Sequence, residues 1–313
     1  MRAMVFDEFG GNENLHMADV PTPDPQKGEV QIKVAYAGCN PVDWKICAGW
    51  LKKRLKTEFP AIPGFDVSGT VSRVGEGVTK FQEGDRVYAY CRNPALVKMG
   101  TYAEYVCFDA NDVAPMPQSL GFKEAAAIPL CALTAWQSFF DKAKLKAGQT
   151  VLIHAGAGGV GSLAIQLAKW AGAKVYTTAS SRNHDYVKQL GADEAIDYHT
   201  ENVAEVVPEG FDMVLDCVGE KVFDESLTYV KKGGWLVTIC KLFIEDSVGE
   251  KYGIRTGFVF VQPNGQELEE ISRLFDEGIL ASPQVTEFPL EEAVKAWEQL
   301  QTEHTRGKLV LRL

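Results

Sequence analysis

A run of apolar residues that ends in closely spaced glycines constrains the fold of this chain more than any other feature. The run reads VLIHAGAGGVG from Val151 to Gly161, and helix-forming residues continue as far as Trp170. Gly156, Gly158 and Gly161 stand in the G-x-G-x-x-G register between a predicted strand and a predicted helix. In that register the first glycine permits a tight turn, the second lets the backbone approach a pyrophosphate, and the third lets the helix pack on the strand. The segment therefore predicts a dinucleotide-binding turn; a glycine turn that serves packing alone is the alternative.

The amide groups at the start of the predicted helix support the same interpretation. The free N–H groups and the dipole at a helix N-terminus favour an anion such as a pyrophosphate. We therefore expect the cofactor to contact the whole turn, which comprises Gly156, Ala157, Gly158, Gly159, Val160 and Gly161.

The pattern of predicted elements changes near Lys123. Before it, short β-type runs are separated by Gly and Pro, which is typical of a compact β-rich domain. These runs are residues 30–35, 69–74, 86–90 and 102–107. After it come apolar strands at 151–154, 174–178, 213–217 and 235–240, with helices at 161–171 and 182–191. Such alternation implies right-handed crossovers and a parallel sheet. A helix over 290–302 and a strand over 308–313 are expected at the end of the chain.

Composition and charge exclude several classes of function. The 313 residues suit two packed domains, and no apolar stretch approaches the roughly 18 residues of a membrane span. The net charge of −10 and the scattered lysines and arginines make nucleic acid a poor partner. The seven cysteines form no Cys-x-x-Cys pair, which fits reduced thiols. Because Met1 to Gly10 read as strand and turn without a leader pattern, we expect a soluble, cytoplasmic protein with no membrane partner.

The segment after the second strand of the parallel sheet decides between two cofactors. An NAD enzyme places Asp or Glu there to bind the ribose 2′-hydroxyl. This chain has TTASSRN over residues 177–183, and its next carboxylate is Asp185. A guanidinium matches a phosphate in charge and in geometry. Ser180, Ser181 and Arg182 therefore predict NADPH; the alternative is a helix start with a serine N-cap and a solvated arginine.

Motifs along nearly the whole chain resemble one family, the medium-chain dehydrogenase/reductase superfamily, and within it the zinc-free branch of quinone oxidoreductases and enone (alkenal) reductases. Besides the glycine turn, they are NPVDWK at 40–45, PGFDVSG at 63–69, GDRV at 84–87, GTYAEY at 100–105, LTAW at 133–136, LGAD at 190–193, DCVG at 216–219, KGG at 232–234 and GKLV at 307–310. The resemblance implies an α/β protein with two domains. A GroES-like β-barrel domain is expected over 1–122 with 265–313, and a Rossmann domain with a doubly wound parallel sheet over 123–264.

The zinc-containing members of this superfamily differ from the chain at their metal-ligand positions. They carry a Cys where this chain has Asn40, and a His-Glu pair where it has Phe65 and Asp66. Catalytic zinc needs three protein ligands, and Cys131 alone cannot hold the metal. We therefore expect no metal site.

The resemblance also implies roles for three side chains in catalysis. Asn40 is expected to border the nicotinamide or the substrate, and Lys45 to steady the charge of an enolate. Thr134 is expected to form a hydrogen bond near the nicotinamide ring. Each has an alternative role: an Asx-type turn before Pro41, a solvated surface lysine and a helix-interior threonine.

Three further residues are expected at the cofactor by the same resemblance. Tyr198 resembles the family tyrosine near the adenosine phosphate, with plain packing as its alternative. Val218 and Lys308 belong to the motifs at 216–219 and 307–310 and are also assigned to the cofactor.

The function implied is an NADPH-dependent, zinc-independent reductase that transfers hydride to a quinone or to the C=C bond of an α,β-unsaturated carbonyl compound. Conjugate reduction demands less charge stabilisation than alcohol oxidation, which suits a site without a Lewis-acid metal. The alternatives are a ketone, aldehyde or enoyl-thioester reductase on the same scaffold, and a non-enzymatic NADPH-binding protein of the lens-crystallin kind.

Two expectations concern the partners of the chain. Segments 44–55, 92–100 and 240–257, with Trp50, Leu242, Phe243 and Tyr252, are expected to line the pocket of a small apolar substrate. Residues 257–261 resemble a sheet-edge strand, so a homodimer is expected because an unprotected apolar edge invites aggregation.

Overall fold

The computed structural model describes residues 1–93 and 96–313 and divides the chain into two compact units. The first unit comprises Met1–Leu130, Gln262–Gly278 and Ser282–Leu313, and the second comprises Cys131–Val261 and Ile279–Ala281. No helix in the described part of the chain is both long enough and apolar enough to cross a membrane.

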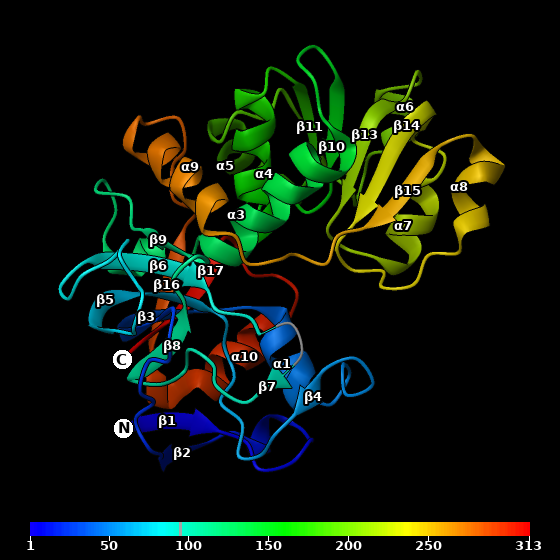
Figure 1. The fold of residues 1–313 in the computed structure, drawn as a ribbon. Coiled ribbons are helices and arrows are strands. Elements are labelled where there is room, and N and C mark those ends of the chain that lie inside the picture. The colour runs from blue at the N-terminus through cyan, green and yellow to red at the C-terminus, as the bar shows by residue number, and fades with distance from the viewer. Residues whose placement is uncertain (94–95) are drawn as a thin grey trace. The chain divides into compact units, whose positions relative to one another are not determined.

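The second unit is built on a parallel sheet of six strands (Figure 1). Its strand order is β12-β11-β10-β13-β14-β15, so the chain starts in the middle of the sheet and builds outward in both directions. This is the 3-2-1-4-5-6 order of a doubly wound nucleotide-binding sheet, which confirms the predicted Rossmann class. The strands are β10 (Thr150–Ile153), β11 (Lys174–Thr178), β12 (Glu194–Ile196), β13 (Phe211–Asp216), β14 (Val230–Thr238) and β15 (Arg255–Phe258).

Helices cover both faces of this sheet because alternate residues along each strand point in opposite directions. Leu152, Tyr176, Val214 and Leu236 lie side by side in register and belong to one buried cluster with Phe223 of α7. The other face is covered by α4, which packs on β10 and β11. The helical segments of this unit are α3 (Pro129–Trp136), whose first two residues belong to the first unit, the π-helical η2 (Gln137–Ala143), α4 (Gly159–Trp170), η3 (Ser181–Asn183), α5 (His184–Gln189), α6 (Val203–Val206), α7 (Glu220–Ser226) and α8 (Asp246–Tyr252).

The first unit is β-rich, as its Gly- and Pro-punctuated sequence predicts. Its main sheet has the order β16-β17-β3-β5-β6-β9, and β8 also pairs with β3. These strands are β3 (Glu29–Cys39), β5 (Asp66–Val74), β6 (Arg86–Tyr90), β8 (Tyr105–Asp109), β9 (Val113–Pro115), β16 (Val285–Pro289) and β17 (Lys308–Arg312). Two small sheets pair β1 (Arg2–Val5) with β2 (His16–Asp19) and β4 (Lys56–Thr57) with β7 (Leu96–Val97). The helical segments are η1 (Asn12–Asn14), α1 (Pro41–Cys47), α2 (Phe122–Ala125), α9 (Gly265–Asp276), η4 (Leu290–Glu292) and α10 (Ala293–Gln301).

The C-terminal strand β17 lies inside the main sheet of the first unit, between β16 and β3 (Figure 1). The two strands are antiparallel, and Leu309 pairs with Cys39. On the other side of β3, Gly38 pairs with Asp66 of β5. This register brings Lys308, Asn40 and Asp66 together, although they are far apart in the sequence.

Both boundaries between the units differ from those predicted, since the first lies at 130/131 where the sequence predicts 122/123, and the second lies at 261/262 where it predicts 264/265. Ser68 Oγ donates a hydrogen bond of 2.6 Å to the carbonyl of Phe122, and Ala126 and Ala127 pack in a buried cluster with Val310. These contacts keep α2 and the residues after it in the first unit, as far as Leu130. At the second boundary, residues 262–264 also belong to the first unit.

Several elements differ in their limits from the sequence prediction. The predicted helix 182–191 is a 3-10 turn followed by a short α5, and the predicted helix 290–302 is likewise split into η4 and α10. The edge strand predicted at 257–261 begins earlier, at Arg255, because Arg255 pairs with Trp235 of β14, and it ends at Phe258.

Candidate functional site

The glycine turn after β10 needs its first and third glycines for packing. Ala155 has a φ of +55°, and the Gly156 N–H donates to the Thr178 carbonyl at 3.0 Å. A Cβ on Gly156 would lie 2.0 Å from Thr177 Oγ1, and one on Gly161 would lie 2.3 Å from the Ala155 carbonyl oxygen. Neither position therefore accepts a side chain without a shift of the backbone or of a buried threonine.

The middle glycine of the motif lies in more open surroundings. A Cβ on Gly158 would meet only the Ala155 carbonyl oxygen, at 3.3 Å. Gly158 is the N-cap of α4, which begins at Gly159, and the first N–H groups of an α-helix have no intrahelical acceptor. Space and free donors thus occur together at the start of α4, which is the arrangement that a pyrophosphate requires. Ala157, Gly159 and Val160 belong to the same turn.

His154, which directly precedes the turn, is buried between two hydroxyl groups. Its Nδ1 lies 3.1 Å from Thr178 Oγ1, and its Nε2 lies 3.0 Å from Ser226 Oγ. Ser226 Oγ donates its own proton to the Val222 carbonyl, so it accepts from Nε2. Nε2 therefore carries a proton, and because burial lowers the pKa of the ring to about 4, the ring is neutral near pH 7 and Nδ1 accepts from the Thr178 hydroxyl.

The segment after β11 carries the predicted 2′-phosphate residues on the surface of the second unit. Ser181, Arg182 and Asn183 form η3, and Arg182 is exposed. Ser180 Oγ accepts a hydrogen bond of 3.2 Å from Asn183 Nδ2, so this serine orients the turn. The predicted serines and arginine thus lie on one short turn.

A carboxylate that the sequence prediction did not consider lies beside Ser181. Asp197 follows β12, the neighbour of β11 in the sheet. Its pKa is lowered by hydrogen bonds from the His199 N–H and then from the hydroxyl and N–H of Ser181. Ser181 is therefore engaged by a carboxylate. In the sequence, Asp197 could have been found from its place directly before the predicted cofactor residue Tyr198. Tyr198 itself is 51% exposed.

Two further predicted residues of the second unit differ in exposure. Val218 is half exposed, and its N–H donates at 2.9 Å to Oδ1 of the buried Asp216. Asp216 also accepts from the Gly219 N–H and the Thr238 hydroxyl, so it holds the turn that presents Val218. Thr134 is buried within α3.

In the first unit, Asn40 lies at the centre of a buried polar cluster with Asp66 and Lys308. Its Nδ2 donates at 2.9 Å to Asp66 Oδ2, and its Oδ1 accepts from Lys308 Nζ at 2.5 Å. Lys308 also donates at 2.8 Å to the Cys39 carbonyl and lies 3.7 Å from Asp66 Oδ2. Asn40, Asp66 and Lys308 are 1%, 0% and 4% exposed. Burial raises the pKa of Asp66, and the positive charge of Lys308 opposes that rise.

The structure thus joins two predicted residues to which the sequence assigns different roles, since Asn40 is predicted for catalysis and Lys308 for the cofactor. Asp66 completes the cluster; the sequence indicates it only as a position where zinc-containing members of the superfamily carry a metal ligand. The Asn40 backbone N–H donates to Asp43 Oδ2 at 2.8 Å, so Asn40 is also the N-cap of α1.

Lys45 lies on α1 between two tryptophans. Its Nζ is 5.5 Å from the ring centroid of Trp44 and 5.5 Å from that of Trp50, and the two rings meet edge to face at 5.2 Å. Trp50 is 64% exposed. The first predicted substrate segment therefore presents an aromatic surface with an ammonium group beside it.

The other two predicted substrate segments give different results. Segment 92–100 contains Pro94 and Ala95, which lie outside the described residues. In segment 240–257, Phe243 is exposed, but Tyr252 of α8 packs against the core of the second unit. Tyr252 therefore contributes to the packing of the second unit.

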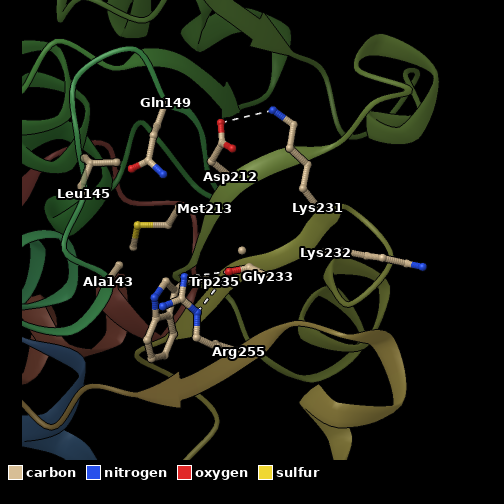
Figure 2. Close-up of a pocket in the computed structure, with 11 residues that line it drawn as sticks. Ala143, Leu145, Gln149, Asp212, Met213, Lys231, Lys232, Gly233, Trp235 and Arg255 are labelled. Atoms are coloured by element: carbon tan, nitrogen blue, oxygen red, sulfur yellow. Dashed lines mark hydrogen bonds and ion pairs between the residues drawn. The ribbon is translucent and has the colours of Figure 1, made fainter.

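A pocket of about 200 Å³ lies elsewhere in the second unit (Figure 2). Its walls come from the amino ends of β10, β13 and β14, where Lys231 pairs with Asp212 at 3.2 Å and Arg255 donates to the Gly233 carbonyl. Ligands of doubly wound sheets bind at the carboxyl ends of the strands. This pocket is at the opposite end of the strands from the glycine turn, so it is not the cofactor site.

Comparisons with known proteins agree with this geometry. The chain matches the alcohol dehydrogenase GroES-like domain family over residues 26–118 and the zinc-binding dehydrogenase family over residues 190–311. It is 35% identical to the NADPH-dependent alkenal/one oxidoreductase of Arabidopsis thaliana, over 99% of this chain and 79% of that protein. The chain belongs to the quinone and enone reductase branch of the medium-chain dehydrogenase/reductase superfamily.

Other members of the branch show the same relationship. The tomato (Solanum lycopersicum) 2-methylene-furan-3-one reductase is 36% identical over 99% of this chain and 79% of its own length. The solved quinone oxidoreductase of Coxiella burnetii is 38% identical, with a TM-score of 0.91 over 100% of this chain and 99% of that one. The Escherichia coli quinone oxidoreductase, solved in complex with NADPH, is 26% identical, with a TM-score of 0.89 over the full length of both chains. The resemblance read from the motifs and the GroES-like assignment are confirmed.

One of the matched families is named for zinc binding, but the residues of this chain do not fit a zinc site. Among the described residues, no three or more His, Cys, Asp or Glu side chains are grouped so as to hold a metal ion. Next to Asn40 and Asp66, the ammonium of Lys308 already supplies a positive charge. A divalent cation beside this ammonium would be repelled, so the cluster does not fit zinc.

Proposed function

We propose that this protein is an NADPH-dependent reductase that transfers hydride to quinones and to the C=C bond of α,β-unsaturated carbonyl compounds, without zinc. The observation that carries the proposal is the glycine turn at the start of α4, which is more open at Gly158 than at Gly156 or Gly161, in a chain that belongs to the quinone and enone reductase branch. The names of its relatives, an alkenal/one oxidoreductase and a 2-methylene-furan-3-one reductase, support the same substrate classes.

The residues of the second unit fit NADPH. The amides at the start of α4 would hold the pyrophosphate, and Arg182 with Ser180 would hold the 2′-phosphate. Tyr198 and Val218 are exposed and would contact the rest of the nucleotide. Bound NADPH supplies a hydride equivalent to the substrate.

The first unit contributes a hydrogen-bond donor to the proposed reaction, the side-chain amide of Asn40. The Nδ2 of Asn40 carries two hydrogens, and Asp66 accepts only one of them. The second hydrogen would bond to the carbonyl oxygen of the substrate, where negative charge develops as the β-carbon is reduced. An enolate spreads this charge over several atoms, so one or two neutral donors suffice and water can deliver the proton that completes the reaction. Lys45, held by Trp44 and Trp50, is a second candidate for this charge.

The proposed independence from zinc is supported by Asn40 and Phe65 at the family's ligand positions and by the ammonium of Lys308 beside Asn40. Elemental analysis of the purified active protein tests it. Activity that depends on stoichiometric zinc and is lost on chelation would contradict this part of the proposal.

A screen of NADPH oxidation tests the main proposal. Quinones, alkenals and cyclic enones should be reduced, and the corresponding saturated ketones and alcohols should not react. NADPH binding without turnover of any of these compounds would favour the non-enzymatic alternative. Turnover confined to saturated carbonyl compounds would favour a ketone or aldehyde reductase.

The proposal extends to assembly and location. β15 is at the edge of the parallel sheet, and Phe258, its last residue, stacks with Phe260, which follows the strand, at 6.1 Å between ring centroids. An edge of this kind is suited to pair with a second copy, so we expect a homodimer in the cytoplasm. Light scattering that gives the 34.4 kDa mass of one chain would contradict the dimer, and cell fractionation tests the location.

A further inference from the structure

The amide of Asn40 has unlike partners at its two ends. Lys308, which has only hydrogens to donate, faces Oδ1. Asp66, whose two carboxylate oxygens both accept from N–H groups, faces Nδ2. The two ends of an asparagine amide have nearly the same shape, so packing alone does not fix which end points where.

Charge fixes the orientation here. Rotation of the amide by half a turn would place its N–H hydrogens against the ammonium of Lys308 and its oxygen against the carboxylate of Asp66. Both contacts would be repulsive, and the cluster is almost fully buried, where such contacts cost most. The present orientation is therefore the only one that satisfies Asn40, Asp66 and Lys308 together.

The backbone around Asn40 is held by the same two ionic residues. Lys308 donates to the carbonyl of Cys39, the residue before Asn40. Asp66 accepts from the N–H of Leu130 through its second oxygen, at 2.8 Å. Lys308 and Asp66 thus connect the end of β3 to β17, β5 and the end of the segment that follows α2.

We propose that Lys308 and Asp66 are positioning residues, which lock the Asn40 amide so that its second Nδ2 hydrogen is held toward the carbonyl oxygen of the substrate. This rests on the proposed role of Asn40. In contrast to the expectation from the sequence, Lys308 acts through Asn40 and not through the cofactor. The two positioning residues need not touch the substrate for this effect.

A double-mutant cycle tests the proposal with the whole protein, NADPH and a quinone substrate. Lys308→Met should lower kcat by about tenfold or more, because a misdirected donor loses transition-state stabilisation. The affinity for NADPH, measured by fluorescence titration, should change less than about twofold. In an Asn40→Ala background, Lys308→Met should change kcat less than about twofold, because residues that act through one group are not additive. Lys33→Met, the same change at an exposed position of β3, is the control.

Three results would overturn the proposal. Lys308→Met could weaken NADPH binding at unchanged kcat, which would return Lys308 to the cofactor site. It could lower kcat equally with and without Asn40, which would indicate a purely structural role. Asn40→Ala could leave kcat unchanged. Asn40 would then have no role in catalysis for Lys308 and Asp66 to support, although the proposed reductase activity would still hold.

A second variant and a second measurement cover a failure to fold and a lack of activity. Lys308→Met alone could fail to fold, because it leaves Asp66 unpaired. The double change Asp66→Asn with Lys308→Met removes both charges. It should lower kcat when Asn40 is present and should not lower it further in the Asn40→Ala background. The side-chain amide of Asn40, identified by NMR through its loss in Asn40→Ala, should exchange with solvent at least about tenfold faster in this double variant. If the hydrogen exchange of the Asn40 amide were unchanged, the proposal that Lys308 and Asp66 hold this amide would be wrong, even if no form of the protein reduced any substrate.

Discussion

The hydroxyl of Tyr102 donates a hydrogen bond of 3.0 Å to Oδ2 of Asp43, and it accepts one of 3.2 Å from Trp297 Nε1. Asp43 is fully buried, and its Oδ1 has no hydrogen-bond partner in the described part of the chain. Burial raises the pKa of Asp43 to about 7, although the Asn40 N–H, the Tyr102 hydroxyl and the charge of Lys308 oppose the rise and Asp66 adds to it. Near neutral pH this carboxyl group therefore gains or loses a proton inside the first unit.

The titration of Asp43 predicts a stability that falls as pH rises. Between the ordinary pKa of 3.8 and about 7, the folded chain holds a proton on Asp43 that the unfolded chain has released. The free energy of unfolding should therefore decrease with pH in this range. Asp43→Asn should flatten the decrease, as measured by urea midpoints across the range. Asp19→Asn, an exposed change in the same unit, should leave the slope as it is; a slope unaffected by Asp43→Asn would contradict the assignment.

His154 predicts the opposite slope in the second unit. Its pKa is lowered from 6.5 to about 4, first by burial, while the charges of Asp216 and Glu225 oppose the shift. Within this window the unfolded chain binds a proton that the folded chain does not, so stability rises with pH. His154→Asn should remove that rise from the unfolding curves. The same dependence in the variant, or its loss in the exposed control His304→Asn, would show that another group is responsible.

The glycines of the turn after β10 predict two separable effects. Gly158→Ala should cost less than about 1 kcal/mol in stability, because its Cβ meets a single atom at 3.3 Å, but it should weaken NADPH binding by roughly tenfold where the pyrophosphate must approach. Gly161→Ala should cost about 1–3 kcal/mol, because its Cβ would lie 2.3 Å from the Ala155 carbonyl oxygen. Chemical denaturation and cofactor titration of each variant distinguish the two. Equal effects on both measurements would contradict the division of roles.

Arg182 predicts a preference for NADPH over NADH. A hydrogen bond to a charged group contributes about 1.5–3 kcal/mol, so Arg182→Ala should raise the KM for NADPH by roughly tenfold or more and the KM for NADH little. Lys188→Ala, on the exposed surface of the adjacent α5, is the matched control. Equal losses with both cofactors would show that Arg182 does not bind the 2′-phosphate.

The sequence predicts those parts of the site whose determinants lie close together in the chain. The glycine turn is an example, because the residues from Val151 to Gly161 contain the strand end, the turn and the helix start. The strand–helix alternation likewise predicts the parallel sheet, because right-handed crossovers leave few alternatives.

Residues that meet through strand pairing could not be predicted in the same way. Lys308 and Asn40 are 268 positions apart and meet only because β17 pairs with β3 in one register. Asp197 follows β12, whereas the sequence rule for the ribose-binding acidic residue applies to the end of β11. The edge strand begins two residues before the predicted Gly257, because its start depends on the pairing of Arg255 with Trp235, which local composition does not reveal.

The position of a deuterium label in the product shows which bond the enzyme reduces, and we expect that bond to be C=C. A saturated ketone concentrates its developing negative charge on one oxygen, and stabilising that oxyanion requires a metal or a well-placed acid. The cluster around Asn40 fits no divalent cation, because the ammonium of Lys308 already lies beside it. An enone spreads the charge into an enolate, which the Nδ2 hydrogen of Asn40 can stabilise before water adds the proton. With NADPH labelled at C4, the deuterium should therefore appear on the β-carbon of the saturated ketone product, and the second hydrogen should come from solvent. Mass spectrometry and NMR of the product decide the matter, and a label on the carbinol carbon of an allylic alcohol would replace conjugate reduction with carbonyl reduction.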